Sequence, residues 1–173
     1  MPIGNLIAGF VALLALVALA MSPFLAAKTI SAVGHHEEIA ADAAANHFNQ
    51  AVRDGAMDFV VHSAHCGTSR ITGADGRATF PHDGDFCVVD VTLHNDGTVP
   101  VALVADVQQA TGSRGAVYPS DGTVDTVVNG GDPAVIPGGS WDEKLVFDVP
   151  PGISLVDVDL HGSAYSRGVV VRL

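Results

Sequence analysis

Basic residues are scarce in this sequence of 173 residues. It holds eight Lys and Arg against 19 Asp and Glu, which gives a formal net charge of −11. Nucleic-acid binding draws most of its affinity from Lys and Arg contacts to phosphates, so the composition argues against a nucleic-acid partner. It argues equally against a polybasic patch that binds a membrane surface.

The usual sequence signatures of enzymes are also missing. No G-x-S-x-G or Ser-x-x-Lys motif occurs, and neither does a phosphate-binding or dinucleotide-binding glycine motif. One Trp and 6% aromatic residues provide no evident platform for stacking sugars. We therefore expect a protein without catalytic activity and without a cofactor.

The first 27 residues contain no Asp, Glu, Lys, Arg or His. A helix of about 25 apolar residues is roughly 37 Å long, enough to cross a bilayer core of about 30 Å. We expect residues 1–27 to form an uncleaved transmembrane anchor. A cleaved signal peptide is the alternative, with cleavage sites after Ala20 or Ala27, but no Lys or Arg precedes the run as signal peptides require.

Residues 28–54 differ from both of their neighbours. They are rich in Ala, lack Pro and place Glu37, Glu38 and Asp42 before His47 and Arg53. Acids early and bases late favour a helix, but no strongly apolar face demands a packing partner. We expect a helical or disordered spacer.

From residue 55 to residue 173 the apolar residues recur with a period of two. Cys87, Val89, Val91 and Leu93 alternate with outward-facing positions, and a turn follows at Asn95. Similar rows occupy 57–61, 141–149, 156–160 and 169–173, and weaker runs lie at 99–109, 116–118, 123–128 and 133–136. Short strands separated by turn residues, with no long helical period, predict an all-β two-sheet sandwich.

The chain has only two cysteines. Cys66 ends one predicted strand and Cys87 lies on the apolar row of another, so adjacent or facing strands would bring them together. A disulfide there would stabilise the domain by roughly 3 kcal/mol and would indicate an oxidising compartment. Two buried free thiols are the alternative.

Several motifs in the same order resemble a family of bacterial exported immunoglobulin-like domains of unknown function, found in Actinobacteria and Firmicutes. The motifs are Cys66-Gly67, Phe86-Cys87, Leu145 to Pro150 and Gly168 to Leu173. Family members carry a signal peptide, lipid anchor or transmembrane helix before the domain, and their fold is similar to that of a small secreted mycobacterial immunoprotective antigen. The resemblance implies an immunoglobulin-like sandwich outside the cytoplasm and no general catalytic activity.

Three groups of polar residues are candidate sites. Asp157, Asp159 and His161 are spaced by two along a strand, so they share one face and could hold a divalent metal ion. Their spacing is also that of a solvated strand face, which we favour. The other two groups are weaker metal candidates. Asp121, Asp125, Asn129 and Asp132 are interpreted as loop residues whose oxygens could bind calcium, and the second group is His62, His65 and Cys66.

A hydrolase would need a nucleophile and a base. Ser163 or Ser166 could supply the nucleophile and the nearby His161 the base.

The sequence therefore favours a membrane-anchored or secreted extracytoplasmic domain that binds an envelope or extracellular protein. A calcium-binding or other divalent-metal-binding domain is the alternative, and a hydrolase ranks third.

Overall fold

The computed structural model describes residues 47–131 and 133–173. The predicted anchor and most of the predicted spacer lie outside these residues. In the described part of the chain, no helix combines the length and the apolar character needed to cross a membrane.

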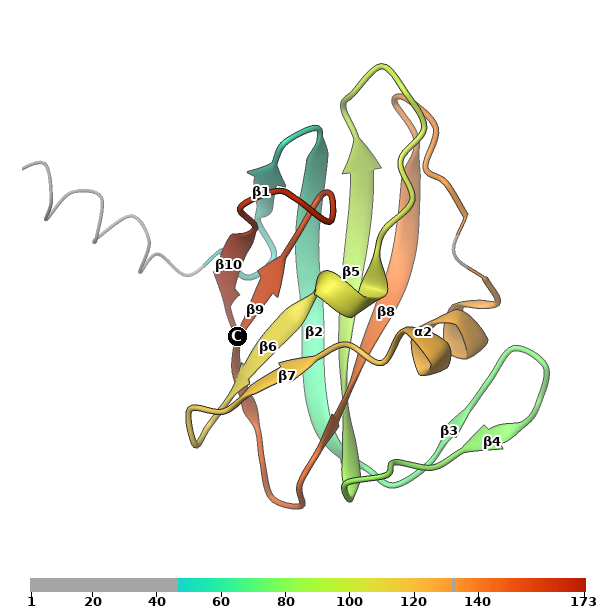
Figure 1. Ribbon diagram of the computed structural model, residues 1–173, viewed down its shortest axis with the longest axis vertical. Helices are drawn as coiled ribbons and strands as arrows, with labels where there is room; N and C mark the ends of the chain where they lie inside the picture. The colour runs from blue at the N-terminus through green and yellow to red at the C-terminus, as the bar shows by residue number, and fades with distance from the viewer. Residues whose placement is uncertain (1–46, 132) are drawn as a thin grey trace, which may run out of the picture. The chain divides into compact units, whose positions relative to one another are not determined.

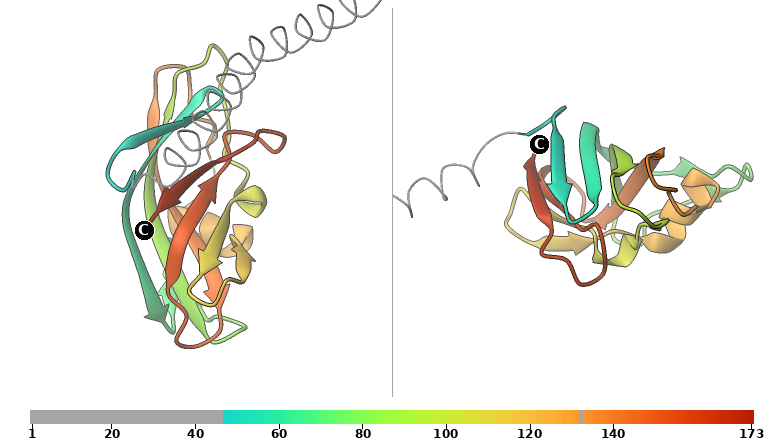
Figure 2. Two further views of the ribbon diagram at one scale, coloured as in Figure 1. Left: turned by 90° about the vertical axis from the view of Figure 1, so that its left-hand side faces the viewer. Right: turned by 90° about the horizontal axis from the view of Figure 1, so that it is seen from above.

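The described residues form two four-stranded antiparallel sheets, which Figures 1 and 2 show as separate layers. The first sheet has the order β1 (Ala51–Asp54), β2 (Met57–Thr68), β5 (Asp85–Asn95), β8 (Ser140–Val149). The second has the order β10 (Val169–Arg172), β9 (Leu155–Leu160), β6 (Gln109–Gly112), β7 (Val117–Pro119). The predicted β-sandwich is confirmed.

The core lies between the sheets and is built from the predicted alternating rows. Cys87, Val89, Val91 and Leu93 of β5 are all buried, with at most 1% of each exposed. The other buried apolar residues that pack with them come from both sheets: Val52, Met57, Phe59, Val61, Ala110, Val135, Leu145, Phe147, Val149, Ile153, Val158, Leu160 and Val171. The apolar rows of the two sheets thus face one another, as the period of two requires.

The chain crosses between the sheets three times after β5. It passes from β5 to the β6–β7 hairpin of the second sheet, returns to β8, and crosses again to the β9–β10 hairpin. A 3-10 turn, η1 (Ala105–Val107), precedes β6. Two buried amides hold the crossings: Asn95 donates to the carbonyls of Val99 and Val135, and Gln108 donates to those of Val104 and His161.

One predicted weak strand is a helix instead. Residues 123–128 lie within α2 (Gly122–Asn129), which runs beside β8. Asp121 caps its N-terminus, because one carboxylate oxygen accepts from the amides of Thr123 and Val124, and Gly130 ends it in the left-handed conformation with φ of 76°. These two caps favour the helix, although the β-branched side chains of the segment suit a strand.

The outer face of the first sheet is apolar only at one end. Phe86 and Val88 of β5 and Val146 of β8 point away from the main core and are buried with Val124 of α2. The small hairpin β3 (Ile71–Thr72) and β4 (Ala78–Thr79) lies on the same side of the domain, and Ile71 packs against this second cluster.

The sandwich begins earlier than residue 55. Residues 51–54, assigned above to the spacer, form β1 and pair with β2 from Ala51 opposite Val60 to Asp54 opposite Met57. Val52 and Asp54 are buried, and a carboxylate oxygen of Asp54 accepts from the amide of Gly162 in the β9–β10 turn. This short edge strand has too few apolar residues to stand out from the Ala-rich segment before it.

Candidate functional site

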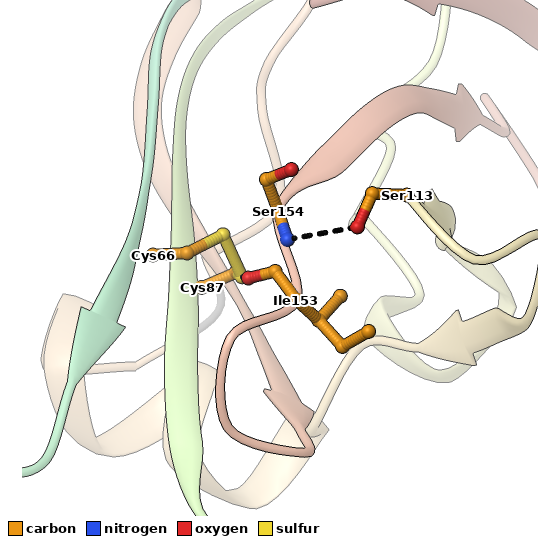
Figure 3. Close-up of a disulfide and its surroundings, with 5 residues drawn as sticks. All are labelled: Cys66, Cys87, Ser113, Ile153 and Ser154. Atoms are coloured by element: carbon orange, nitrogen blue, oxygen red, sulfur yellow. Dashed lines mark hydrogen bonds between the residues drawn. A yellow bond between two sulfur atoms is a disulfide. The ribbon is translucent and has the colours of Figure 1, made fainter.

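Cys66 and Cys87 form a disulfide, as predicted (Figure 3). The pairing of β2 with β5 is irregular between His65 and Thr68, and this irregularity places Cys66 opposite Cys87. Cys87 is fully buried and Cys66 is half-buried. Both cysteines of the chain are therefore used, and neither is a free thiol nucleophile.

The disulfide stands next to the segment that leads into β9. The carbonyl oxygen of Ile153 lies 4.0 Å from the sulfur of Cys87. The neighbouring Ser154 exchanges hydrogen bonds with Ser113 of the β6–β7 turn, with 2.7 Å from the amide of Ser113 to the carbonyl of Ser154. The bridge thus lies at a point where the two sheets are joined.

A shallow depression of about 350 Å³ marks the outer face of the first sheet, and we call it the outer polar depression. Its lining comes from β2, β5, β8 and the end of α2: His62, Asp90, Val91, Thr92, Asn129, Asp142, Glu143 and Lys144. Most small-molecule pockets are enclosed and apolar, whereas this one is lined mainly by polar side chains.

Three of these side chains form a hydrogen-bonded chain. Thr92 and Asp142 are register partners, and the hydroxyl of Thr92 donates to the carboxylate of Asp142 over 2.6 Å. His62, in a break of the β2–β5 register, places Nε2 2.8 Å from the same hydroxyl. Because the single hydroxyl hydrogen goes to Asp142, Nε2 of His62 donates.

This order differs from that of a catalytic triad. In a triad the imidazole lies between the acid and the hydroxyl, so that the acid orients it and it removes the hydroxyl proton. Here the hydroxyl of Thr92 lies between His62 and Asp142. The arrangement leaves the imidazole no role as a base toward Thr92.

The charges of the depression are largely paired with one another. Asp90 binds Lys144, its register partner on β8, and also accepts from the hydroxyl of Ser63. Burial alone would raise the pKa of the Asp90 carboxyl, but the hydrogen bonds from Lys144 and Ser63 outweigh it, so the pKa lies below the usual value of 3.8. Asp90 is thus ionised at neutral pH.

The structure does not bring Asp157, Asp159 and His161 together as three metal ligands. Asp159 and His161 approach to 3.5 Å, while Asp157 lies opposite Arg172 in the β9–β10 register. Within residues 47–131 and 133–173, no group of three His, Cys, Asp or Glu is placed to hold a metal ion. The solvated-face interpretation fits this placement only in part: the carboxylates alternate with buried Val158 and Leu160, but Oδ1 of Asp159 is itself buried and accepts no hydrogen bond from the described residues.

The other groupings from the sequence are also separated. Ser163 and Ser166 bond to each other across their turn, and Nδ1 of His161 lies 3.3 Å from the backbone carbonyl of Ser166, not from a serine hydroxyl. Cys66 is in the disulfide, so it is not available as a metal ligand beside His62 and His65.

The sequence analysis missed a set of polar residues on α2. Asp121, Asp125 and Asn129, read there as loop residues, face the free edge of β8. Their spacing of four residues is the signal that would have found them, since side chains at i, i+4 and i+8 share one helix face. Asp132, grouped with them, lies outside the described residues.

The side chains of Asp125 and Asn129, together with the backbone amide of Asp121, pair with the backbone of β8. A carboxylate oxygen of Asp125 accepts from the amide of Val146 over 2.7 Å, and the amide of Asp121 donates to the carbonyl of Val146 over 2.7 Å. The carboxamide of Asn129 accepts from the amide of Lys144 over 2.9 Å and donates to its carbonyl over 3.0 Å. The helix thus supplies the hydrogen bonds that a neighbouring strand would supply.

Asp125 is fully buried. Burial raises the pKa of its carboxyl to about 8, against the lowering effect of bonds from Ser120 and Val146, and nearby Glu143 and Asp121 raise it further. The carboxyl is therefore protonated and neutral at pH 7.

Comparison with known proteins extends the resemblance. No curated protein matches the sequence. Among solved structures, the yjhA protein from Bacillus subtilis is similar with a TM-score of 0.52 at 10% sequence identity, over 75% of this chain and 99% of that one. An uncharacterized β-sandwich protein from Clostridium difficile 630 matches at a TM-score of 0.49 and 9% identity, over 73% of this chain and 91% of that one. At 10% identity, the similarity to the yjhA protein shows a shared fold and nothing more.

The family comparison goes further than the structural one. Residues 47–170, well over half of the chain, match one family model. The match begins just before β1 and ends within β10, so it spans almost the whole sandwich. This chain therefore belongs to the family described as Domain of unknown function (DUF4352).

Proposed function

We propose that this chain is an extracytoplasmic domain, anchored in or secreted across the cytoplasmic membrane, that binds an envelope or extracellular protein without catalysing a reaction. The observation that carries the location is the Cys66–Cys87 disulfide, with Cys87 fully buried in the core. Disulfides persist in oxidising compartments and are rare in a reducing cytoplasm.

The strand order supports an immunoglobulin-like assignment. In immunoglobulin domains, strands G, F and C form one sheet, which C′ extends, and A, B and E belong to the other. The order β10, β9, β6, β7 corresponds to G, F, C, C′, and β2, β5, β8 correspond to A, B, E. Helix α2 then stands where strand D would pair with E. Such domains are common carriers of binding surfaces.

The outer polar depression is the surface we assign to binding. It is open, polar and internally charge-paired through Asp90 and Lys144. The hydroxyl-centred order of His62, Thr92 and Asp142 gives it donors and acceptors without a nucleophile and base. Polar side chains held by one another in this way suit a protein contact more than a reaction.

The location is tested by intact mass under non-reducing conditions, on protein from the envelope and from the medium. We expect full-length chain in the membrane, lighter than the reduced form by two hydrogens. A shorter species in the medium that starts near residue 21 or 28 would make it a secreted factor. A reduced chain in the cytoplasm would overturn the proposed location.

The binding role is tested by photo-cross-linking in living cells. A photoreactive residue at position 142 in the depression is compared with one at position 170, an exposed position on β10 of the other sheet. We expect a discrete protein adduct from position 142 that is weak or absent from position 170 and is lost in the H62A variant. Equal yields from both positions would contradict the assignment of this surface.

A further inference from the structure

Helix α2 acts as a substitute strand along the edge of β8. Four hydrogen bonds join it to the backbone of two β8 residues, Lys144 and Val146. A side-chain carboxyl and a side-chain amide provide three of the four. The helix is therefore held mainly by side-chain groups, and one of these groups, the carboxyl of Asp125, can gain or lose a proton.

The apolar part of this contact is small. Of the helix side chains, Val124 is buried against Phe86, Val88 and Val146, and Val128 packs against them in part. An eight-residue helix has little intrinsic stability, so its attachment depends on these few contacts and on Asp125.

The hydrogen bonds around Asp125 accommodate a neutral acid as well as an ionised one. Its Oδ1 accepts from the amide of Val146, and its Oδ2 lies within hydrogen-bond distance of the hydroxyl of Ser120. A protonated Oδ2 donates to that hydroxyl, which in turn donates to the carbonyl of Val146, 3.3 Å away. Every polar atom is then satisfied without a buried charge.

The charged groups on the surrounding elements give an ionised Asp125 little support. On β8, Glu143 is buried and Lys144 is engaged by Asp90. On α2 itself the neighbour is Asp121, and both Asp121 and Glu143 oppose ionisation. The elements packed on the other sides carry Asp106 in η1 and the Asp75–Arg77 pair in the β3–β4 hairpin.

We propose that α2 is a pH-released cap on the edge of β8, latched by the protonated carboxyl of Asp125 and freed when that proton is lost. An ionised Asp125 in this place would be a buried charge beside Glu143, and the least costly way to solvate it is to move the short helix away. The pKa of about 8 belongs to Asp125 with the helix attached, and a released helix returns it toward the usual 3.8, so the release occurs at or below about pH 8.

Release would expose two elements at once. The backbone N–H and C=O groups of Lys144 and Val146 would be free to pair with an added strand. The β3–β4 hairpin would loosen too, because the amide of Ala74 donates to the carbonyl of Val127 over 3.0 Å.

Trp141 gives a direct readout in the full-length chain, since it is the only Trp. Its indole donates to Glu143 over 2.7 Å, and Glu143 also accepts from Asn129 of α2. We expect a reversible change of Trp141 emission with a midpoint at or below about pH 8 in the wild type, and none up to about pH 9.5 in D125N, whose amide mimics the protonated acid.

D121N is the matched control on the same helix. It removes a charge but keeps an N-cap, so the transition should persist with a lower midpoint. The absence of a wild-type transition, or an unchanged transition in D125N, would overturn the proposal.

Amide exchange supplies a second measurement that does not rely on fluorescence. At about pH 9, the amides of Lys144 and Val146 should exchange at least tenfold faster in the wild type than in D125N, and comparison at one pH removes the base-catalysed contribution. Equal exchange rates would overturn the proposal even if D125N were less stable overall.

Discussion

Two apolar clusters lie on opposite faces of the first sheet, and they differ in what completes them. The inner cluster fills the space between the sheets with residues from seven strands and is closed by the disulfide. The outer cluster has four buried residues, Phe86, Val88, Val124 and Val146, and the buried acid Asp125 stands beside it.

The buried polar groups behave differently in the two regions. Asn95 and Gln108, at the inner core, are neutral amides whose bonds to backbone do not change with pH. Asp125, at the outer cluster, is a buried acid that becomes a buried charge when it loses its proton. The inner core is therefore a permanent scaffold, and the attachment of α2 is a contact of marginal, adjustable strength.

The largest expected effect separates the two clusters directly. Phe147 is fully buried in the inner cluster, so F147A should lower the free energy of unfolding by about 3–5 kcal/mol. V124A in the outer cluster should cost only about 1–2 kcal/mol. Urea denaturation of both variants checks the difference, and similar losses would show that the clusters carry equal weight.

Removing the disulfide tests the inner region by another route. The bridge joins residues 21 apart, and the double variant C66A/C87A should be less stable by about 3 kcal/mol because the unfolded chain gains freedom. Dithiothreitol should destabilise the wild type by a similar amount and leave the variant unaffected. If the double variant had the same urea midpoint of unfolding as the wild type, this account would be refuted.

The outer region should respond to pH. Since the pKa of Asp125 rises from 3.8 to about 8 on folding, the folded state keeps a proton that the unfolded state loses, and wild-type stability falls as the pH rises from 4 to 8. D125N lacks this loss and should exceed the wild type by about 1–3 kcal/mol at pH 8, with the gap closing below pH 4. Urea titrations at pH 4, 6 and 8 measure the gap, which should not be constant.

The smallest effect belongs to the outer polar depression. The pKa of Asp90 is lowered, so its ion pair with Lys144 stabilises the fold above pH 3.8 and the stabilisation is lost as the acid is protonated below that value. Both side chains are partly solvated, so D90N should cost less than about 1 kcal/mol at pH 7. Thermal melts at low and high salt check this prediction. Added salt should reduce the difference in stability between D90N and the wild type, whereas a difference that does not depend on salt would indicate lost packing instead.

Much of the inner region is predictable from the sequence. The row Cys87, Val89, Val91 and Leu93 indicates its strand and buried face, because a period of two admits one arrangement against a core. The disulfide follows from two cysteines at the ends of such rows. The outer region is not predictable in this way, since Phe86 and Val88 are buried by α2 and by Ile71 of the β3–β4 hairpin, which the pattern of β5 does not indicate.

The candidate sites also differ in whether the sequence indicates them. Asp157, Asp159 and His161 are close in sequence and are candidate metal ligands for that reason, but they do not form a three-ligand group. The outer polar depression joins His62, Thr92 and Asp142 from three strands, and only strand register brings such distant residues together. Periodicity defines a face of a strand but not which strand lies beside it.

The sequence by itself determined the class of fold, the main core and the disulfide, because alternation and turn residues act locally along the chain. Only the tertiary structure decided that residues 122–129 form a helix, that this helix completes the edge of β8, and that Asp125 is buried. The reason is physical: the segment carries β-branched residues that suit a strand, and the caps together with the unpaired edge of β8 outweigh that preference.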